Sequence, residues 1–189
     1  MMTPAISIAL RTTAMLLSLF VLNPTQAKAQ ATNQMSTTTA PAHITNSFDF
    51  EVRAPFARVA PLFGPEAERA WAGEHWNPTF LYPQPARDTQ GAVFTIQHGP
   101  HTTIWVNTLF DLAAGRMQYV YFIPDTLVTT VDVALTSLGP SRTAVHVTYT
   151  RTALNPSVNS DVITRGESDR TSGPIWQKQI ETHLALHDK

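Results

Sequence analysis

The sequence predicts an α+β fold in which a C-terminal helix packs on one face of an antiparallel sheet. Three observations predict it. Several short segments alternate apolar with polar residues, which is the period of half-buried strands. Turn-forming residues separate these segments by short connections, so the strands should follow one another as an antiparallel meander. After the last segment the apolar residues recur every three to four positions, which is the period of an amphipathic helix.

The domain is predicted to begin with one strand and two short helices. A strand covers 44–53, where apolar and polar residues alternate. Pro55 suits the first turn of a helix over 56–63, because proline lacks only an N–H that this turn leaves unpaired. A second short helix is expected over 66–71, with acidic residues in its first turn, and a short extended piece over 80–82.

Five further strands are predicted, at 91–98, 102–110, 116–123, 127–138 and 142–153. Turn residues such as Gly99-Pro100 and Gly139-Pro140 separate them.

The C-terminal helix is predicted over 174–186, with Trp176, Ile180 and Leu184 on one face. The preceding segment, 158–170, is weakly helical. Gly173-Pro174 interrupts the pattern, so the sequence leaves open whether these two helices are continuous.

Composition excludes several classes of protein. The 189-residue chain has a net charge of -1, which argues against a basic surface built to hold nucleic acid. It contains no cysteine, which excludes disulfides, thiolate metal sites and a cysteine nucleophile. Gly-x-Ser-x-Gly, phosphate-loop and dinucleotide-binding motifs are also absent from the sequence, and we expect no cofactor.

Residues 1–29 have the layout of a secretory signal peptide. Arg11 precedes an apolar run at 12–22, and Ala27-Lys28-Ala29 is a small-x-small cleavage pattern. The apolar run is much shorter than the roughly 20 residues that a membrane-spanning helix needs. We therefore expect cleavage before Gln30, a periplasmic or secreted location, and no membrane span in the mature protein. A polar leader over 30–43 should precede a single domain over 44–189.

Six segments carry a family resemblance. They are FDFEVRAPFARVAPLFGPEAERAW, HWNPTFLYP, GAVFTIQHG, TIWVNTLFD, MQYVYFIPD and AVHVTYTRTALN, in this order within 44–155. Together they resemble the SRPBCC superfamily, the START-like or Bet v 1-like helix-grip proteins. The most specific part is the strand-Ala-Pro-helix followed by Glu68-x-x-Trp71 and Trp76-x-Pro78. The resemblance implies a curved antiparallel sheet of about seven strands around a C-terminal helix, with an apolar cavity between them.

Aromatic residues are the candidate ligand-binding set. Each could equally belong to an ordinary core, but together they suit a pocket for an apolar ligand that needs a few orienting hydrogen bonds. The set is Trp71, Trp76, Phe94, Trp105, Tyr119, Tyr121, Tyr149 and Trp176. Tyr119 and Tyr121 share one strand face and Val120 and Phe122 share the other. Both faces are apolar, so the sequence does not decide which one points inward.

Charged residues offer weaker candidates. Glu66, Glu68, Glu74 and His75 flank the tryptophan-rich segment and could act as acids or bases. The simpler interpretation, which we prefer, is that Glu66 and Glu68 favour a helix N-terminus and that Glu74 is solvated. The dispersed arginines are interpreted as solvated surface, although Arg151 could pair with an anionic head group.

A metal site would need three or four convergent ligands. His98-x-x-His101 is the closest histidine pair, with Glu74-His75 as a further contribution. Because the pair flanks a predicted hairpin tip, where polar side chains are normally solvated, we expect no metal site.

These observations predict an exported protein that holds a small hydrophobic molecule, lipid-like or aromatic, between the sheet and the C-terminal helix. The alternative is a polyketide-cyclase-like enzyme in which cavity residues such as Glu74, His75 or a tyrosine move protons on a bound ring. A third hypothesis is a homodimer that forms through an apolar outward face of the sheet.

Overall fold

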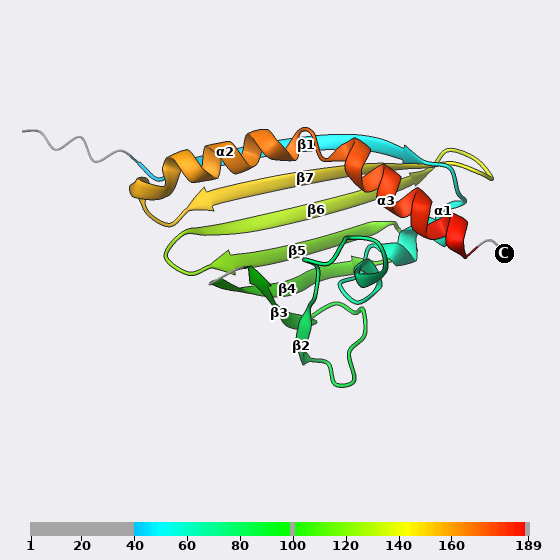
Figure 1. Cartoon of the computed structure of the whole chain (residues 1–189), viewed down its shortest axis with the longest axis horizontal. Coiled ribbons are helices and arrows are strands. Elements are labelled where there is room, and N and C mark those ends of the chain that lie inside the picture. Colours follow the sequence, from blue (N-terminus) through cyan, green and yellow to red (C-terminus); the bar gives the residue numbers. More distant parts are fainter. Residues whose placement is uncertain (1–39, 99–100, 188–189) are drawn as a thin grey trace, which may run out of the picture. The chain divides into compact units, whose positions relative to one another are not determined.

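The computed structural model describes residues 40–98 and 101–187. The predicted signal peptide and most of the predicted leader lie outside these residues. Within them, seven strands form one antiparallel sheet in the order β1-β7-β6-β5-β4-β3-β2 (Figure 1). β2 and β3 turn away from the direction of β5, β6 and β7, which gives the sheet its curvature. The strands are β1 (His43–Val52), β2 (Thr79–Tyr82), β3 (Val93–His98), β4 (His101–Asp111), β5 (Arg116–Ile123), β6 (Leu127–Ser137) and β7 (Thr143–Ala153).

The first strand of the chain lies beside the last strand in the sheet. β1 pairs with β7 along its whole length, from His43 opposite Thr152 to Val52 opposite Thr143. Every other pair of neighbouring strands is consecutive in the chain. The segment between β1 and β2, which are the two edge strands, holds the short helices. The predicted fold class, an α+β helix-grip with about seven antiparallel strands, is confirmed.

Two helices at the C-terminus cover one face of the sheet. α2 (Asn159–Asp169) packs on β1 and β7, and α3 (Gly173–Leu186) packs on β1 (Figure 1). A break between them settles the question that the sequence left open, because α3 begins at Gly173 with Pro174 in its first turn. A Cβ on Gly173 would lie 2.9 Å from the backbone oxygen of Asp49, so only glycine lets α3 start this close to β1.

The remaining helical pieces are short. α1 (Phe56–Val59) follows Pro55 as predicted and continues as a 3-10 turn, η1 (Ala60–Leu62). The segment predicted as a second short helix is a 3-10 turn, η2 (Ala67–Ala70), and η3 (Pro156–Val158) leads into α2. No helix in the described part of the chain is long and apolar enough to cross a membrane.

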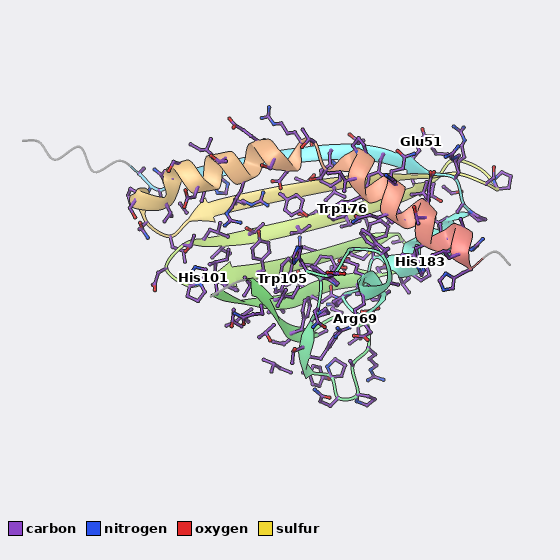
Figure 2. All side chains as sticks on the ribbon, in the orientation of Figure 1. Glu51, Arg69, His101, Trp105, Trp176 and His183 are labelled. Atoms are coloured by element: carbon purple, nitrogen blue, oxygen red, sulfur yellow. The ribbon has the colours of Figure 1, made fainter. Side chains whose placement is uncertain are left out.

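Burial decides which sheet face points inward. Along β5, Tyr119 and Tyr121 are buried on the helix side, whereas Val120 is half-buried and Phe122 is 39% exposed on the other side. The outward face also exposes Ile104, which lies opposite Phe122 on the neighbouring strand. Trp105 reaches the space between sheet and helix from β4, and Trp176 reaches it from α3 (Figure 2).

Candidate ligand-binding site

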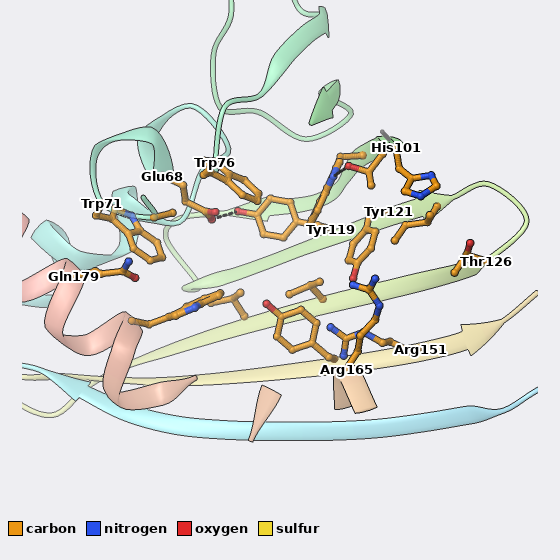
Figure 3. A pocket seen from close by; sticks show the side chains of 18 of the residues that line it. Glu68, Trp71, Trp76, His101, Tyr119, Tyr121, Thr126, Arg151, Arg165 and Gln179 are labelled. Atoms are coloured by element: carbon orange, nitrogen blue, oxygen red, sulfur yellow. Dashed lines mark hydrogen bonds between the residues drawn. The ribbon is translucent and has the colours of Figure 1, made fainter. Parts of the chain in front are cut away.

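The inward face of the sheet does not pack completely against the helices. A cavity of about 520 Å³ remains between β4–β7, the turn η2 and the C-terminal helices. That volume lies within the range of pockets that bind small organic molecules. Its walls are largely aromatic, and charged side chains stand at both ends (Figure 3).

Seven of the eight predicted ligand-binding residues line this cavity. They are Trp71, Trp76, Trp105, Tyr119, Tyr121, Tyr149 and Trp176. Phe94 does not line it. Phe94 is fully buried behind the wall, with its ring centroid 5.8 Å from that of Trp105 and 5.5 Å from that of Phe80, so it supports the wall instead of forming its surface.

Three of the cavity tryptophans are fixed by hydrogen bonds to the protein itself. Trp71 Nε1 donates to the carbonyl of Leu62, and Trp76 Nε1 donates to the carbonyl of Pro65, each at 2.8 Å. Trp105 Nε1 donates to Thr103 Oγ1 at 2.7 Å. Because these indole N–H groups are already paired, the rings present their apolar faces to the cavity.

Ring contacts join the wall residues into two clusters, one on the sheet side and one on the helix side. Trp105 stacks on Tyr121 with ring centroids 4.2 Å apart, and Trp76 meets Trp105 edge to face at 5.3 Å. On the helix side, Trp71 and Trp176 meet at 5.4 Å. Aromatic pairs with these geometries each contribute roughly 0.5–1.5 kcal/mol beyond the burial of their area. The wall is therefore preorganised for a flat or apolar ligand.

Glu68 is a buried carboxyl group in this aromatic surface. It lies in η2, lines the cavity and is only 5% exposed. Its Oε1 lies 3.3 Å from the hydroxyl of Tyr119 (Figure 3). Burial raises the pKa of Glu68 well above its usual value, because the charged form loses its hydration.

The hydroxyl of Tyr119 holds the carboxyl in place. It donates to the backbone carbonyl of Phe63 and also faces Glu68 Oε1, which accepts from it. This contact lowers the pKa of Glu68, but burial is the larger effect and the net shift is upward. Burial thus favours the neutral form of Glu68, which can donate a hydrogen bond inside the cavity.

Asp88 holds the turn that carries Glu68. Its two carboxylate oxygens accept hydrogen bonds from the backbone N–H groups of Glu66 (2.7 Å) and Ala67 (3.1 Å). It packs so closely against Gly64 that a Cβ there would overlap the carboxyl group. Asp88 thus caps η2 as a capping residue does at a helix start.

The sequence-based interpretation of the acidic residues is corrected by this geometry. Glu68, interpreted as an acid that favours a helix N-terminus, is buried in the cavity. Glu74 and His75, expected in the cavity if the protein were an enzyme, are exposed and lie outside it. Glu66 pairs with Arg69 at 2.9 Å. The spacing Glu68-x-x-Trp71 within the motif was the one signal that linked this carboxyl to the aromatic set.

Arg151 is also corrected, from solvated surface to buried cavity wall. It is 5% exposed, and its two terminal nitrogens donate to the two carboxylate oxygens of Asp169 on α2. Its guanidinium lies 4.5 Å from the ring centroid of Tyr149, within cation–π range. The strand alternation could have indicated this position. Every second residue of a strand points to the same face, and Arg151 shares the inward face of β7 with Val145, Val147 and Tyr149.

Among the residues that the structure describes, the histidines do not assemble a metal site. His101 is exposed at the start of β4 and lines one end of the cavity. In the described ranges, 40–98 and 101–187, no three His, Asp or Glu side chains come together as metal ligands would.

Solved structures share this architecture. No protein-family model and no curated protein matches the sequence. Norcoclaurine synthase from Thalictrum flavum, in complex with dopamine and hydroxybenzaldehyde, aligns with a TM-score of 0.56 and 11% identity, covering 79% of this chain and 90% of that one. An uncharacterized protein from Rhizobium leguminosarum aligns with a TM-score of 0.55 and 17% identity, covering 78% and 97%. A protein from Thermobifida fusca aligns with a TM-score of 0.55 and 19% identity, covering 75% of this chain and 94% of that one. The chain therefore has the SRPBCC, or Bet v 1-like, helix-grip fold.

Proposed function

We propose that this protein binds a small, largely apolar molecule, lipid-like or aromatic, in the cavity between the sheet and the C-terminal helices. The observation that carries the proposal is the 520 Å³ of space that the seven aromatic wall residues leave unfilled. Burial of apolar ligand surface there contributes about 25 cal/mol per Å². The few polar groups in the wall, such as Glu68 and Arg151, would fix the ligand's orientation.

A blocked cavity tests this proposal. Val131 lies on the inward face of β6 and lines the cavity, whereas Val128 lies on the outward face of the same strand. The apolar fluorophore N-phenylnaphthylamine should bind to the wild-type protein and to Val128→Phe. It should lose at least about tenfold in affinity on Val131→Phe, because a phenyl ring then occupies the ligand's space. Equal binding to both variants would contradict a ligand in this cavity.

A second candidate function is acid–base catalysis, of the kind that polyketide cyclases perform on a bound ring. The specific observation is the buried Glu68–Tyr119 pair. A neutral carboxyl in an apolar cavity can give its proton to a ligand oxygen that becomes basic during reaction, and can recover a proton when product forms. Norcoclaurine synthase, with the same fold, is an enzyme by name, which supports catalysis in such a cavity by analogy alone.

Glu68→Gln separates binding from catalysis. The amide keeps the size and a hydrogen-bond donor toward Tyr119 but has no transferable acidic proton. If the protein is an enzyme, the variant should bind the molecule that co-purifies with the wild type yet no longer convert it. Unchanged conversion by Glu68→Gln would exclude this carboxyl as the catalytic acid.

We also propose that the protein is exported to the periplasm or secreted. The support is the signal-peptide pattern of residues 1–29. Mass spectrometry of the protein from its producing cells should give a mature chain that begins at Gln30. A chain that retains residues 1–29 would contradict export by cleavage.

A homodimer stays a prediction. Its basis is the outward apolar face, where Ile104 and Phe122 lie opposite each other on adjacent strands. Sedimentation velocity tests it, since a protein that remains monomeric at all accessible concentrations would contradict it.

A further inference from the structure

Two guanidinium groups stand at the end of the cavity away from Glu68. The side chains of Tyr121, Arg151 and Arg165 gather there, and Glu68 lies at the opposite end (Figure 3). Arg151 comes from β7 and Arg165 from α2, so the two arginines approach the space from the sheet and from the helix layer.

We propose that this arginine end, formed by Tyr121, Arg151 and Arg165, binds an anionic oxygen group of the ligand, so that the ligand is an amphipathic organic acid. This inference rests on the proposed binding function. It adds the chemical class of the ligand and its orientation, with the acidic group at the arginine end and the apolar body against the tryptophans.

The charges around the two arginines leave room for an anion. Both arginines act on one buried carboxylate, that of Asp169: Arg151 donates to it with two nitrogens, and Arg165 attracts it through space. Asp169 thus brings one buried negative charge against the two positive charges that act on it. The other carboxylate in the cavity lining on this helix is Asp161, which is exposed and lies four residues before Arg165.

Hydrogen-bond donors are available at the same place. The Nε of Arg151 is buried and has no hydrogen-bond partner among the described residues. A buried N–H donor on a charged guanidinium is costly to leave unpaired. A ligand oxygen that accepts a hydrogen bond from it would therefore be favoured. The hydroxyl of Tyr121 lies within hydrogen-bonding range of the same guanidinium and can donate to the ligand as well.

The opposite end of the cavity does not repel an anion. Glu68 is the carboxyl group there, and its burial in the wall raises its pKa well above the usual value, which favours the neutral form. A ligand with one negative charge therefore meets positive charge at the arginine end and no full negative charge at the other.

A pair of related dyes tests the proposal. N-phenylnaphthylamine and anilinonaphthalene sulfonate share the same ring system, but only the second carries an anionic group. The wild-type protein should bind the sulfonate about tenfold or more tightly than the neutral dye, as one charge-assisted hydrogen bond provides. Arg165→Gln, at an exposed position that should not disturb folding, should lower this preference at least about threefold.

Matched variants separate a local site from overall charge. Arg87→Gln removes the same charge from an exposed position outside the cavity and should leave the preference unchanged. The double variant Arg151→Gln/Asp169→Asn removes the buried charges together and should abolish most of the preference. Asp161→Asn removes a negative charge from the lining and should strengthen sulfonate binding.

The outcomes distinguish this inference from the proposed function. If both dyes bind equally, or if Arg165→Gln and the double variant keep the full preference, the anion site is overturned while the binding function stands. An equal loss in Arg87→Gln would also overturn it, because the preference would then reflect overall charge. If neither dye binds, the proposed function fails and the anion site fails with it.

Discussion

The hydroxyl of Tyr119 and the carboxyl of Glu68 meet at 3.3 Å in the wall of the cavity, although they are 51 residues apart in the sequence. Tyr119 is fixed by its strand and by the hydrogen bond that its hydroxyl donates to the carbonyl of Phe63. Glu68 is fixed by a turn that Asp88 caps. Burial of this carboxyl among the aromatic side chains of the wall raises its pKa and favours its neutral form.

Glu68 should make the stability of the protein depend on pH. Its pKa is raised in the folded state above the usual 4.5, so between pH 4.5 and that raised value the folded protein holds a proton that the unfolded chain has released. The free energy of unfolding should therefore fall as pH rises through this window, by at most about 1.4 kcal/mol per pH unit from this group.

Urea denaturation of Glu68→Gln checks this dependence. The amide does not titrate, so the variant should gain stability relative to wild type as pH rises above 4.5. Glu74→Gln, which removes an exposed carboxyl outside the cavity, is the matched control. A constant difference between wild type and Glu68→Gln from pH 4 to pH 8 would show that Glu68 is ionised in the folded protein.

Loss of one partner of the Arg151–Asp169 pair should lower the free energy of unfolding much more than replacement of both partners by apolar residues. Each single change, Arg151→Met or Asp169→Leu, leaves a buried charge without its partner and should destabilise the protein by about 3–5 kcal/mol. The double variant with both changes should recover most of that loss. Chemical denaturation measures all three, and a double variant no more stable than either single one would contradict this account.

The exposed pair between Arg142 and Glu51 provides the comparison. Its side chains are 56% and 53% exposed, so solvent screens the interaction. Removal of either partner should change the midpoint of denaturation much less than the buried pair does.

Asp88→Ala should loosen the turn that carries Glu68. The change leaves the N–H groups of Glu66 and Ala67 without their acceptor and should cost about 1–2 kcal/mol, as the loss of a helix cap does. Amide hydrogen exchange should rise in η2 and stay unchanged in β6 and β7. If the protection of the η2 amides against exchange is the same in Asp88→Ala as in wild type, Asp88 does not hold this turn.

Gly173→Ala should weaken the junction between α2 and α3. The new Cβ would lie 2.9 Å from the backbone oxygen of Asp49, so the helix or β1 must shift. Thermal denaturation should show a loss of about 1–3 kcal/mol. Ile175→Ala, an exposed position in the same turn, is the control and should have a small effect. Equal effects would indicate that α3 has room to move.

Much of the fold could be predicted from the sequence because its signals are local. Alternation placed the long strands, and Gly173-Pro174 marked the break that the structure shows between α2 and α3. The segment after Pro65 was predicted as a helix and is a single 3-10 turn, and Asp88 caps its start from a distant part of the chain. A cap 22 residues away leaves no local pattern.

The sequence allowed us to predict which aromatic residues form the cavity wall, but not how the charged groups are arranged in it. Aromatic side chains were expected around a cavity, and seven of eight do line it. The buried positions of Glu68 and Arg151, the two charged groups that give the cavity its chemistry, were not predicted. Glu68 was interpreted as an acid at a helix N-terminus and Arg151 as solvated surface, since charged residues are rarely buried. Their burial depends on long-range partners, Tyr119 and Asp169, that only the folded structure brings close.

Native mass spectrometry of the mature protein, purified gently from the cells that produce it, tests the central claim most directly. We expect a native mass that exceeds the mass of the polypeptide, and release of one small organic molecule on denaturation, detectable as an anion. Val131→Phe should lose that molecule and Val128→Phe should keep it. A native mass equal to that of the bare polypeptide in every preparation would contradict the proposal that this cavity holds a ligand.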